Sequence, residues 1–269
     1  MKIAALGPRG TFSHEAVLKY KDANIMFCNT IYDVFEAVEK DNAELGIVPI
    51  ENSVSGTIWL TIDALSEFDL NITGEILIPI NHNLAGKEVK AENVKKLYCH
   101  HQAYVQCEKF IRRRIKNAKI IYTSSNGESA EMLAADKLKE SAAIVPRIAA
   151  QLNKLKIIMK NIQDNKNNAT KFIVIGKDEA KRTGKDRTTL LIYPHHDKPG
   201  LLYSIIGILA KHNINMSKLE SIPAKGKIGD YFFLIDITGH YEDEKVRNAI
   251  EKLEDEYAVK VKGSYRREY

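Results

Sequence analysis

The sequence predicts an α/β fold in which two related lobes are followed by a smaller, ferredoxin-like βαββαβ domain. Short apolar strands alternate with helical patterns from residue 2 to about residue 175, as they do in a parallel α/β sheet. A polar, basic stretch at 178–187 has no apolar periodicity and is predicted to be a linker. Beyond it, the pattern indicates four antiparallel strands and two helices in the order of a ferredoxin-like sandwich.

The first region opens with a predicted strand at Lys2–Leu6 that ends in a turn at Gly7–Gly10. A helix then begins near Thr11 or Ser13, because either hydroxyl can cap its first turn. The other predicted elements are an amphipathic helix at Ile31–Asp41, a helix that opens at Ser53–Gly56, and strands at Leu45–Ile50, Glu75–Ile80, Lys95–Cys99, Lys119–Tyr122, Ala142–Val145 and Ile173–Ile175.

Two of these strands repeat one pattern. Glu44–Pro49 reads ELGIVP and Ser141–Pro146 reads SAAIVP, and a helix is predicted after each. This echo favours two related lobes, and such lobes usually bind a ligand in the cleft at the carboxyl ends of their strands. Glu51 and Asn52 lie at one of these strand ends.

The second region contains the predicted βαββαβ elements. Its strands are expected at Thr188–Pro194, Ile214–Ile222, Tyr231–Thr238 and Ala258–Tyr265, and its helices at Pro199–His212 and Glu242–Glu254. The period of the apolar residues changes after the linker, which indicates a separate domain.

Composition excludes several classes of protein. The chain has 269 residues, of which 44% are apolar and 28% charged, an ordinary globular composition that is large enough for two domains. The three cysteines form no CxxC pair, which argues against a disulfide framework or a zinc site and favours the cytoplasm. No apolar run reaches membrane-spanning length, so no membrane partner is expected.

Nucleic acid and metal ions are not expected as partners either. The densest basic cluster, Arg112–Arg114 with Lys116, has no interleaved aromatic residues and is interpreted as a solvated helix face. The formal charge of +5 suits a small anionic substrate equally well. The adjacent pairs His100-His101 and His195-His196 would diverge on a strand or a helix, so no metal site is expected.

The run Thr170-Lys171-Phe172 carries the strongest local signal for a site. It places a hydroxyl, a cation and an aromatic ring at the entry to a buried strand, which predicts an anion-handling site. Gly184-Lys185 lacks the spacing of a P-loop, and Gly7–Gly10 lacks the GxGxxG spacing of a dinucleotide site. No nucleotide cofactor is therefore expected.

The order and spacing of short motifs resemble those of monofunctional prephenate dehydratase with a C-terminal ACT regulatory domain. The motifs run along nearly the whole chain: Gly7–Ser13 (GPRGTFS), Val48–Ser53 (VPIENS) with Gly56-Thr57, His82–Leu84 (HNL), Cys99-His100, Gln106-Cys107, Ser125-Asn126, Thr170–Phe172 (TKF), Pro199–Leu202 (PGLL), and Asn215 with Glu220–Pro223 (ESIP). The resemblance implies a bilobed, periplasmic-binding-protein-like catalytic region at 1–177, with lobes at 1–74 plus 160–177 and at 75–159. A linker at 178–187 and an ACT domain at 188–269 follow.

The resemblance also implies an activity. The family converts prephenate to phenylpyruvate, needs no cofactor, is inhibited by L-phenylalanine through the ACT domain, and forms homodimers or homotetramers. Catalytic roles are expected for Thr170, Lys171 and Glu51. Substrate contacts are expected for Thr11, Asn52, Ser53, Ser55, Gly56, Gln106, Ser125, Asn126 and Phe172, and contacts to L-phenylalanine for Gly200, Leu201, Leu202, Asn215, Glu220 and Ser221.

Alternative interpretations of these residues stay open at this point. Thr170 is expected to hydrogen-bond the leaving oxygen or relay a proton to it, and Lys171 to hold a carboxylate or to pair with Glu51. Helix capping explains Thr11, Ser53 and Ser55 almost as well as substrate contact does. For Phe172, core packing is favoured over substrate contact. For the whole chain, arogenate dehydratase and a non-catalytic amino-acid sensor are the alternative functions.

Three positions depart from the family pattern. Lys171 stands in place of arginine, which keeps the charge but loses the planar fork that binds a carboxylate bidentately. Cys99 stands where serine is common, and Ile222 stands in place of the arginine of the ESRP signature. These substitutions concern substrate binding, a hydrogen bond and the inhibitor site, respectively.

Overall fold

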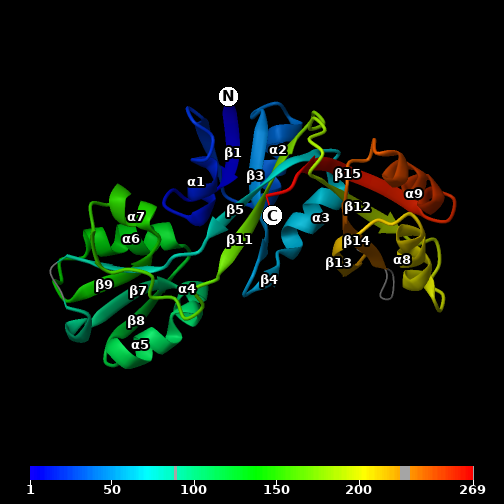
Figure 1. Cartoon of the computed structure of the whole chain (residues 1–269). Helices are drawn as coiled ribbons and strands as arrows, with labels where there is room; N and C mark the ends of the chain where they lie inside the picture. Colours follow the sequence, from blue (N-terminus) through cyan, green and yellow to red (C-terminus); the bar gives the residue numbers. More distant parts are fainter. Residues whose placement is uncertain (88–89, 225–230, 269) are drawn as a thin grey trace. The chain divides into compact units, whose positions relative to one another are not determined.

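The computed structural model describes residues 1–87, 90–224 and 231–268 (Figure 1). Its strands are β1 Lys2–Leu6, β2 Asn24–Cys28, β3 Leu45–Asn52, β4 Gly56–Thr57, β5 Asn71–Pro79, β6 Asn83–Gly86, β7 Lys96–His100, β8 Lys119–Thr123, β9 Ser141–Val145, β10 Lys156–Met159, β11 Ala169–Gly176, β12 Asp186–Tyr193, β13 Met216–Pro223, β14 Tyr231–Thr238 and β15 Ala258–Arg266. Its α-helices are α1 Phe12–Val17, α2 Ile31–Glu39, α3 Trp59–Glu67, α4 His101–Gln106, α5 Glu108–Arg114, α6 Asn126–Ala135, α7 Arg147–Leu152, α8 Leu201–Lys211 and α9 Glu244–Glu254, and a short 3₁₀ turn covers Ala91–Asn93.

Within the described residues the strands form three sheets. The first has the order β2-β1-β3-β11-β5, with β4 paired to β3, the second has the order β10-β6-β9-β7-β8, and the third has the order β13-β14-β12-β15. The two ELGIVP-like strands, β3 and β9, both lie in the interior of their sheets. The predicted α/β class with a C-terminal βαββαβ domain is confirmed.

The strand directions differ in part from the prediction. β1 is parallel to β2 and β3, and β7 is parallel to β8 and β9. In contrast, β6 is antiparallel to both β9 and β10. The parallel arrangement expected from the sequence therefore holds for β7, β8 and β9 but not for β6 and β10. A fully buried strand is a short apolar run in either direction, so its sequence carries no signal for polarity.

Helices cover both faces of the second sheet. On one face, Ala143 and Val145 of β9 pack with Ala130 and Leu133 of α6. On the other face, Ala142 and Ile144 of the same strand belong to a cluster that includes residues of α4 and α5. Successive strand residues point to opposite faces, which explains why Ala142–Val145 of β9 are all apolar.

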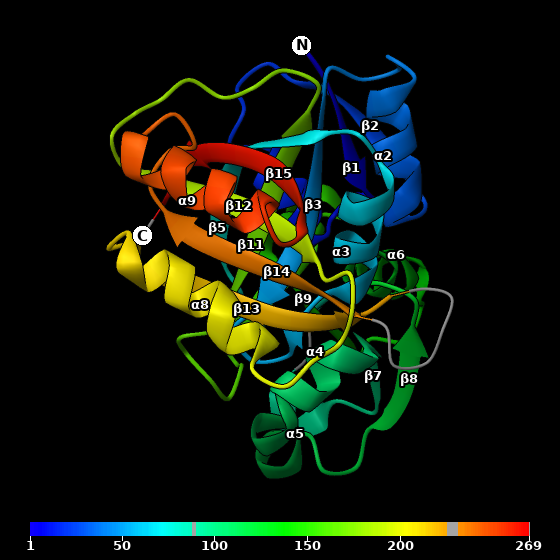
Figure 2. The ribbon, with the colours of Figure 1, turned by 90° about the vertical axis from the view of Figure 1, so that its right-hand side faces the viewer.

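The third sheet is covered on one face by α8 and α9 (Figure 2). Ile205 and Leu209 of α8 and Val246 and Leu253 of α9 share one apolar cluster with alternate residues of β12 and β14, including Leu190. The strands pair antiparallel throughout the described part of this sheet. The βαββαβ prediction reproduces all six elements to within a few residues because each carries its own apolar period.

Contrary to the prediction, the segment Ser53–Gly56 does not begin a helix. It turns the chain from β3 into β4. Asn52 Oδ1 accepts hydrogen bonds from the backbone N–H groups of Val54 and Ser55 at 3.0 and 2.9 Å. Gly56 has φ +81°, a left-handed conformation that favours glycine. The side chain of Asn52 and the glycine therefore close a turn whose serines resemble helix caps in sequence.

The chain divides into two compact units that are described separately. The first consists of 1–61 and 77–172, and the second of 62–76 and 173–269. The second unit thus contains the start of β5 together with the third sheet. Lys262 Nζ donates to the carbonyl of Phe68 at 2.9 Å, and Gly263 (φ +130°) approaches Ile72 so closely that an added Cβ would lie 2.2 Å from its carbonyl oxygen.

The predicted linker is shorter than expected at its C-terminal end. Asp186 and Arg187, its last two residues, already belong to β12 and are buried. Arg187 forms an ion pair with Glu75 of β5, which makes burial of a charged residue tolerable. No helix in the described ranges has the length and apolarity needed to cross a membrane.

Candidate active site

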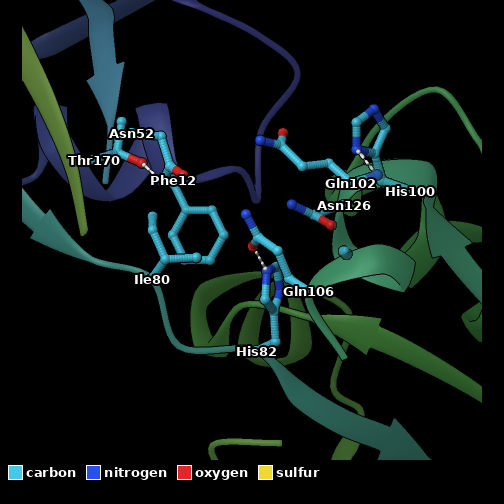
Figure 3. A pocket seen from close by; sticks show the side chains of 10 residues that line it. Phe12, Asn52, Ile80, His82, His100, Gln102, Gln106, Asn126 and Thr170 are labelled. Carbon is cyan, nitrogen blue, oxygen red and sulfur yellow. Dashed lines mark hydrogen bonds between the residues drawn. The ribbon is translucent and has the colours of Figure 1, made fainter. Parts of the chain in front are cut away.

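Two adjoining cavities lie in the first unit, where residues from the first and second sheets and their helices come together (Figure 3). The larger measures about 250 Å³ and the smaller about 50 Å³. Phe12, Asn52, His100, Gln102, Asn126 and Thr170 line both. Ile80, His82, Ala103 and Gln106 complete the smaller cavity, and Leu6, Gly7, Thr11, Ser13, Pro49, Ile58, Ser124, Ser125 and Phe172 complete the larger one.

Asn52 at the end of β3 fixes the hydroxyl of Thr170 on β11. Because Asn52 Oδ1 accepts from two backbone N–H groups, the orientation of its amide is set and Nδ2 must be the donor. Nδ2 donates to Thr170 Oγ1 at 2.9 Å and to Asn168 Oδ1 at 2.8 Å. The Thr170 hydroxyl therefore accepts from Asn52 and keeps its own proton for a group inside the cavity, since no described residue accepts from it.

Glu51 and Lys171 lie beside this pair but on the other side of the strands. Lys171 Nζ is 3.7 Å from Glu51 Oε2, and the lysine side chain is 6% exposed. Neither residue is among the described residues that line either cavity. Side chains alternate across a strand, so Thr170 and Phe172 face the cavity while Lys171 between them does not. The structure thus joins Lys171 to Glu51, as one of the two expectations for Lys171 had it.

His82 and Gln106 form a buried pair at the floor of the smaller cavity. His82 Nε2 is 2.8 Å from Gln106 Oε1, and the His82 side chain is 2% exposed. The Phe12 ring packs edge-on against the imidazole, with 5.5 Å between ring centroids. Burial lowers the pKa of His82 to about 4, so the imidazole is neutral at pH 7.

This buried histidine predicts a pH dependence of stability. Its folded-state pKa lies below the value of about 6.5 in an unfolded chain, so the unfolded state binds more protons between pH 4 and pH 6.5. The contribution of neutral His82 to the stability of the folded state is complete above pH 6.5 and is lost as the pH falls toward 4. Between pH 7 and pH 5, His82 lowers the free energy of unfolding by about 2 kcal/mol. Urea unfolding of the parent and of His82→Leu at pH 7 and pH 5 checks this. The free energy of unfolding should fall by about 2 kcal/mol less in His82→Leu than in the parent; an equal fall in the two proteins would contradict the assignment.

The remaining predicted residues of the first unit divide into cavity-lining and turn residues. Thr11 caps α1 by accepting from the His14 backbone N–H at 3.4 Å, and Ser125 caps α6 by accepting from the Glu128 backbone N–H at 3.0 Å; both also line the larger cavity. Asn126 Oδ1 is buried without a protein partner. Ser53, Ser55 and Gly56 belong to the turn, where Ser55 Oγ accepts from Gln102 Nε2 at 2.7 Å.

Several cavity residues were not predicted from the sequence. Phe12, Ile80, His82, His100, Gln102 and Ser124 line the cavities without having been assigned a role. His82 stands in the HNL motif directly after an apolar strand, which is a usable signal, because a histidine at the end of a buried strand needs a partner. Gln102 and Ile80 carry no comparable signal, because their positions depend on how distant segments meet.

The predicted L-phenylalanine residues occupy the start of α8 and the strand β13. Gly200 precedes α8 with φ +83°, Leu201 is buried in the apolar cluster of the third sheet, and Leu202 packs at its edge. Asn215 and Ser221 are exposed, while Glu220 is half-buried and pairs with Lys218 at 3.6 Å. Leu201 is therefore a core residue in this structure.

Two of the three departures from the family pattern have a structural explanation. Cys99 is fully buried among apolar residues, and burial raises the pKa of its thiol to about 12. It is thus a neutral core residue, and it does not line the cavities. Ile222 is 2% exposed, so an apolar residue at this position is packed rather than presented to solvent.

Comparison with known proteins agrees with this architecture. A family model described as prephenate dehydratase matches residues 3–180, and an ACT domain model matches residues 189–255. A bifunctional chorismate mutase/prephenate dehydratase of Aquifex aeolicus is 38% identical over 268 residues, which cover 98% of this chain and 73% of that protein. A prephenate dehydratase of Methanocaldococcus jannaschii is 38% identical over 255 residues, 92% of this chain and 91% of that one.

A solved structure of a prephenate dehydratase in complex with L-Phe from Arthrobacter aurescens superposes with a TM-score of 0.92. It is 33% identical and the match covers 99% of this chain and 90% of that one. Fold and site define a two-lobed α/β enzyme with a C-terminal ACT domain. The chain belongs to the prephenate dehydratase family.

Proposed function

We propose that this chain converts prephenate to phenylpyruvate, carbon dioxide and water in the cavity that Thr170 lines. The observation that carries the proposal is the Asn52–Thr170 hydrogen bond, which leaves a hydroxyl proton available to the cavity. Prephenate has a ring carboxylate and, on the opposite ring carbon, a hydroxyl group. As the carbon–carbon bond to the carboxylate breaks, its electron pair enters the ring and the carbon–oxygen bond breaks. The leaving oxygen takes up one proton and departs as water.

The lining suits this reaction in two respects. The Thr170 hydroxyl donates a hydrogen bond to the leaving oxygen as negative charge develops on it, and a positioned donor is worth most where charge develops. The described lining has no lysine or arginine, so the departing carboxylate is not held by a cation. Apolar walls such as Ile58 and Phe172 strip it of water, which favours its loss as neutral carbon dioxide.

The second carboxylate of prephenate needs polar contacts that anchor the substrate. Ser125 and Asn126 begin α6, and a helix N-terminus favours an anionic group. We assign the pyruvyl carboxylate to this end of the cavity, with Gln102 and Thr11 nearby. Lys171 and Glu51 lie on the side of the strands away from the cavity, where their ion pair fixes the ends of β11 and β3. Ser53, Ser55 and Gly56 hold the turn that carries Asn52.

The C-terminal part of the proposal is regulation. Residues 1–177 form the catalytic region, with lobes at 1–74 plus 160–177 and at 75–159. Residues 178–185 link it to an ACT domain that begins with β12 at Asp186, and L-phenylalanine binds to this domain as a feedback inhibitor. The solved relative with L-Phe supports this, as does the glycine that opens α8, where Gly200 lets a ligand approach the backbone. The chain functions as a homodimer or homotetramer in the cytoplasm, and its free cysteines fit a reducing compartment.

The test is turnover of prephenate by the purified chain, followed as phenylpyruvate, with and without L-phenylalanine. Product that L-phenylalanine suppresses supports both parts of the proposal. Product without suppression refutes the regulatory part. Arogenate as the preferred substrate would make the chain an arogenate dehydratase. Absence of product from both substrates, with L-phenylalanine still bound, would identify an amino-acid sensor.

A further inference from the structure

We infer that His82 is a positioning residue, which holds the amide of Gln106 so that its N–H groups point into the smaller cavity and bind the leaving oxygen. The inference rests on the proposed function and extends it to a residue that does not itself touch the substrate. Thr170 and Gln106 then approach the same oxygen from elements that belong to different sheets. Thr170 lies on β11 of the first sheet, and Gln106 lies on α4, which packs on the second.

The backbone around His82 fixes the imidazole before any substrate arrives. Its N–H donates to Gln163 Oε1 at 3.0 Å, and its carbonyl accepts from the Ile162 N–H at 2.9 Å. Phe12 packs against the ring at an interplanar angle of 82°. With backbone and ring both held, the imidazole has one orientation in which to meet Gln106.

The protonation state of the ring decides which way the Gln106 amide faces. A neutral imidazole carries one N–H, and His82 Nδ1 is buried without a hydrogen-bond partner. A buried N–H without a partner is rarer and more costly than a buried acceptor without one. The proton therefore resides on Nε2, which donates to Gln106 Oε1 at 2.8 Å.

The amide nitrogen of Gln106 is consequently turned away from His82. Figure 3 shows it pointing toward the interior of the cavity, and no described residue accepts a hydrogen bond from it. The opposite tautomer would present the amide oxygen instead and would repel the departing oxygen. The smaller cavity, at about 50 Å³, has room for the released water molecule.

The experiment compares kcat and KM for prephenate in the parent and in His82→Leu, His82→Gln, Gln106→Leu and His82→Leu/Gln106→Leu. Gln106→Leu removes the amide N–H that binds the leaving oxygen and should lower kcat by roughly 10²-fold. His82→Leu should approach the same kcat, and the double variant should match Gln106→Leu, because both changes remove one interaction. In His82→Gln the side-chain amide can place an N–H close to the position of imidazole Nε2, so kcat should stay within about threefold of the parent.

Losses that multiply in the double variant, or a His82→Gln variant as slow as His82→Leu, would overturn the inference. A second readout needs neither a variant nor turnover. In the parent labelled with ¹⁵N-histidine, the ring nitrogens of His82 should report a neutral imidazole protonated at Nε2; protonation at Nδ1 would overturn the inference. Failure of the parent to convert prephenate would refute the proposed function, while the tautomer would still decide the geometry of Gln106.

Discussion

Thr170→Val is expected to lower kcat for prephenate by roughly 10²–10⁴-fold, the range typical of a lost positioned proton donor. Valine matches threonine in shape but replaces the hydroxyl by a methyl group. The hydroxyl is 2.9 Å from Asn52 Nδ2 and its own proton faces the cavity. Without it, charge that develops on the leaving oxygen meets an apolar methyl. KM should change little, because the interaction strengthens mainly in the transition state.

Two variants separate this loss from a loss of fold. Thr170→Ser keeps a hydroxyl within reach of Asn52 and should retain most of the activity. Thr73→Val changes a half-buried threonine of β5 that is absent from the described lining of the cavities and should leave kcat as in the parent. Thermal unfolding of all three proteins checks the fold. A well-folded Thr170→Val protein with normal turnover would refute the role of the hydroxyl.

Glu75→Leu is expected to destabilise the second unit by about 3–5 kcal/mol, because it removes a buried carboxylate that forms an ion pair with the guanidinium of Arg187. Arg187 Nη1 is 2.5 Å from Glu75 Oε2, with side chains 4% and 1% exposed, and the carboxylate of Asp236 lies 4.0 Å from Arg187 Nε. Glu75 Oε1 also accepts from the Glu268 backbone N–H at 2.7 Å. For a chain of this size the loss corresponds to a fall in the unfolding midpoint of roughly 6–20 °C.

Matched variants test whether burial is the cause. Glu36→Leu removes one partner of an exposed ion pair with Lys40, at 2.8 Å, and should lower the midpoint far less, because solvent already screens that pair. Glu75→Leu combined with Arg187→Met removes both buried charges and should recover part of the loss. Scanning calorimetry measures all of these midpoints. A midpoint in Glu75→Leu as high as in Glu36→Leu would contradict the buried-pair argument.

Local sequence pattern predicts most of the helices and strands, but not a turn whose geometry depends on a single side chain. The βαββαβ elements were located from their periods, because each apolar face can be identified within its own segment. The sequence predicts a helix start at Ser53–Gly56 where the structure has a turn, because serine is as common in caps as in turns. The hydrogen bonds that the backbone N–H groups of Val54 and Ser55 donate to Asn52 Oδ1, together with the left-handed Gly56, distinguish the two.

The sequence predicts which residues belong to the candidate site better than it predicts how they are arranged. Thr170, Asn52, Gln106 and Asn126 were predicted and line a cavity. Lys171 is expected either to hold a carboxylate or to pair with Glu51, and the alternation of side chains along β11 directs it to Glu51. The sequence shows His82 only as part of the HNL motif, because no residue near it in the chain indicates that Gln106 is its partner.

The amino-acid sequence by itself determined the α/β class, the ferredoxin-like domain and the family, because these depend on periods and motifs that lie within short stretches of chain. Tertiary structure alone decided which polar groups meet. Asn52 and Thr170 are separated by 118 positions and His82 and Gln106 by 24, so neither contact is encoded in a local pattern. Tertiary structure also decided that Arg187, in a stretch that looks like a linker, is buried, because its charge is neutralised by a carboxylate 112 positions away.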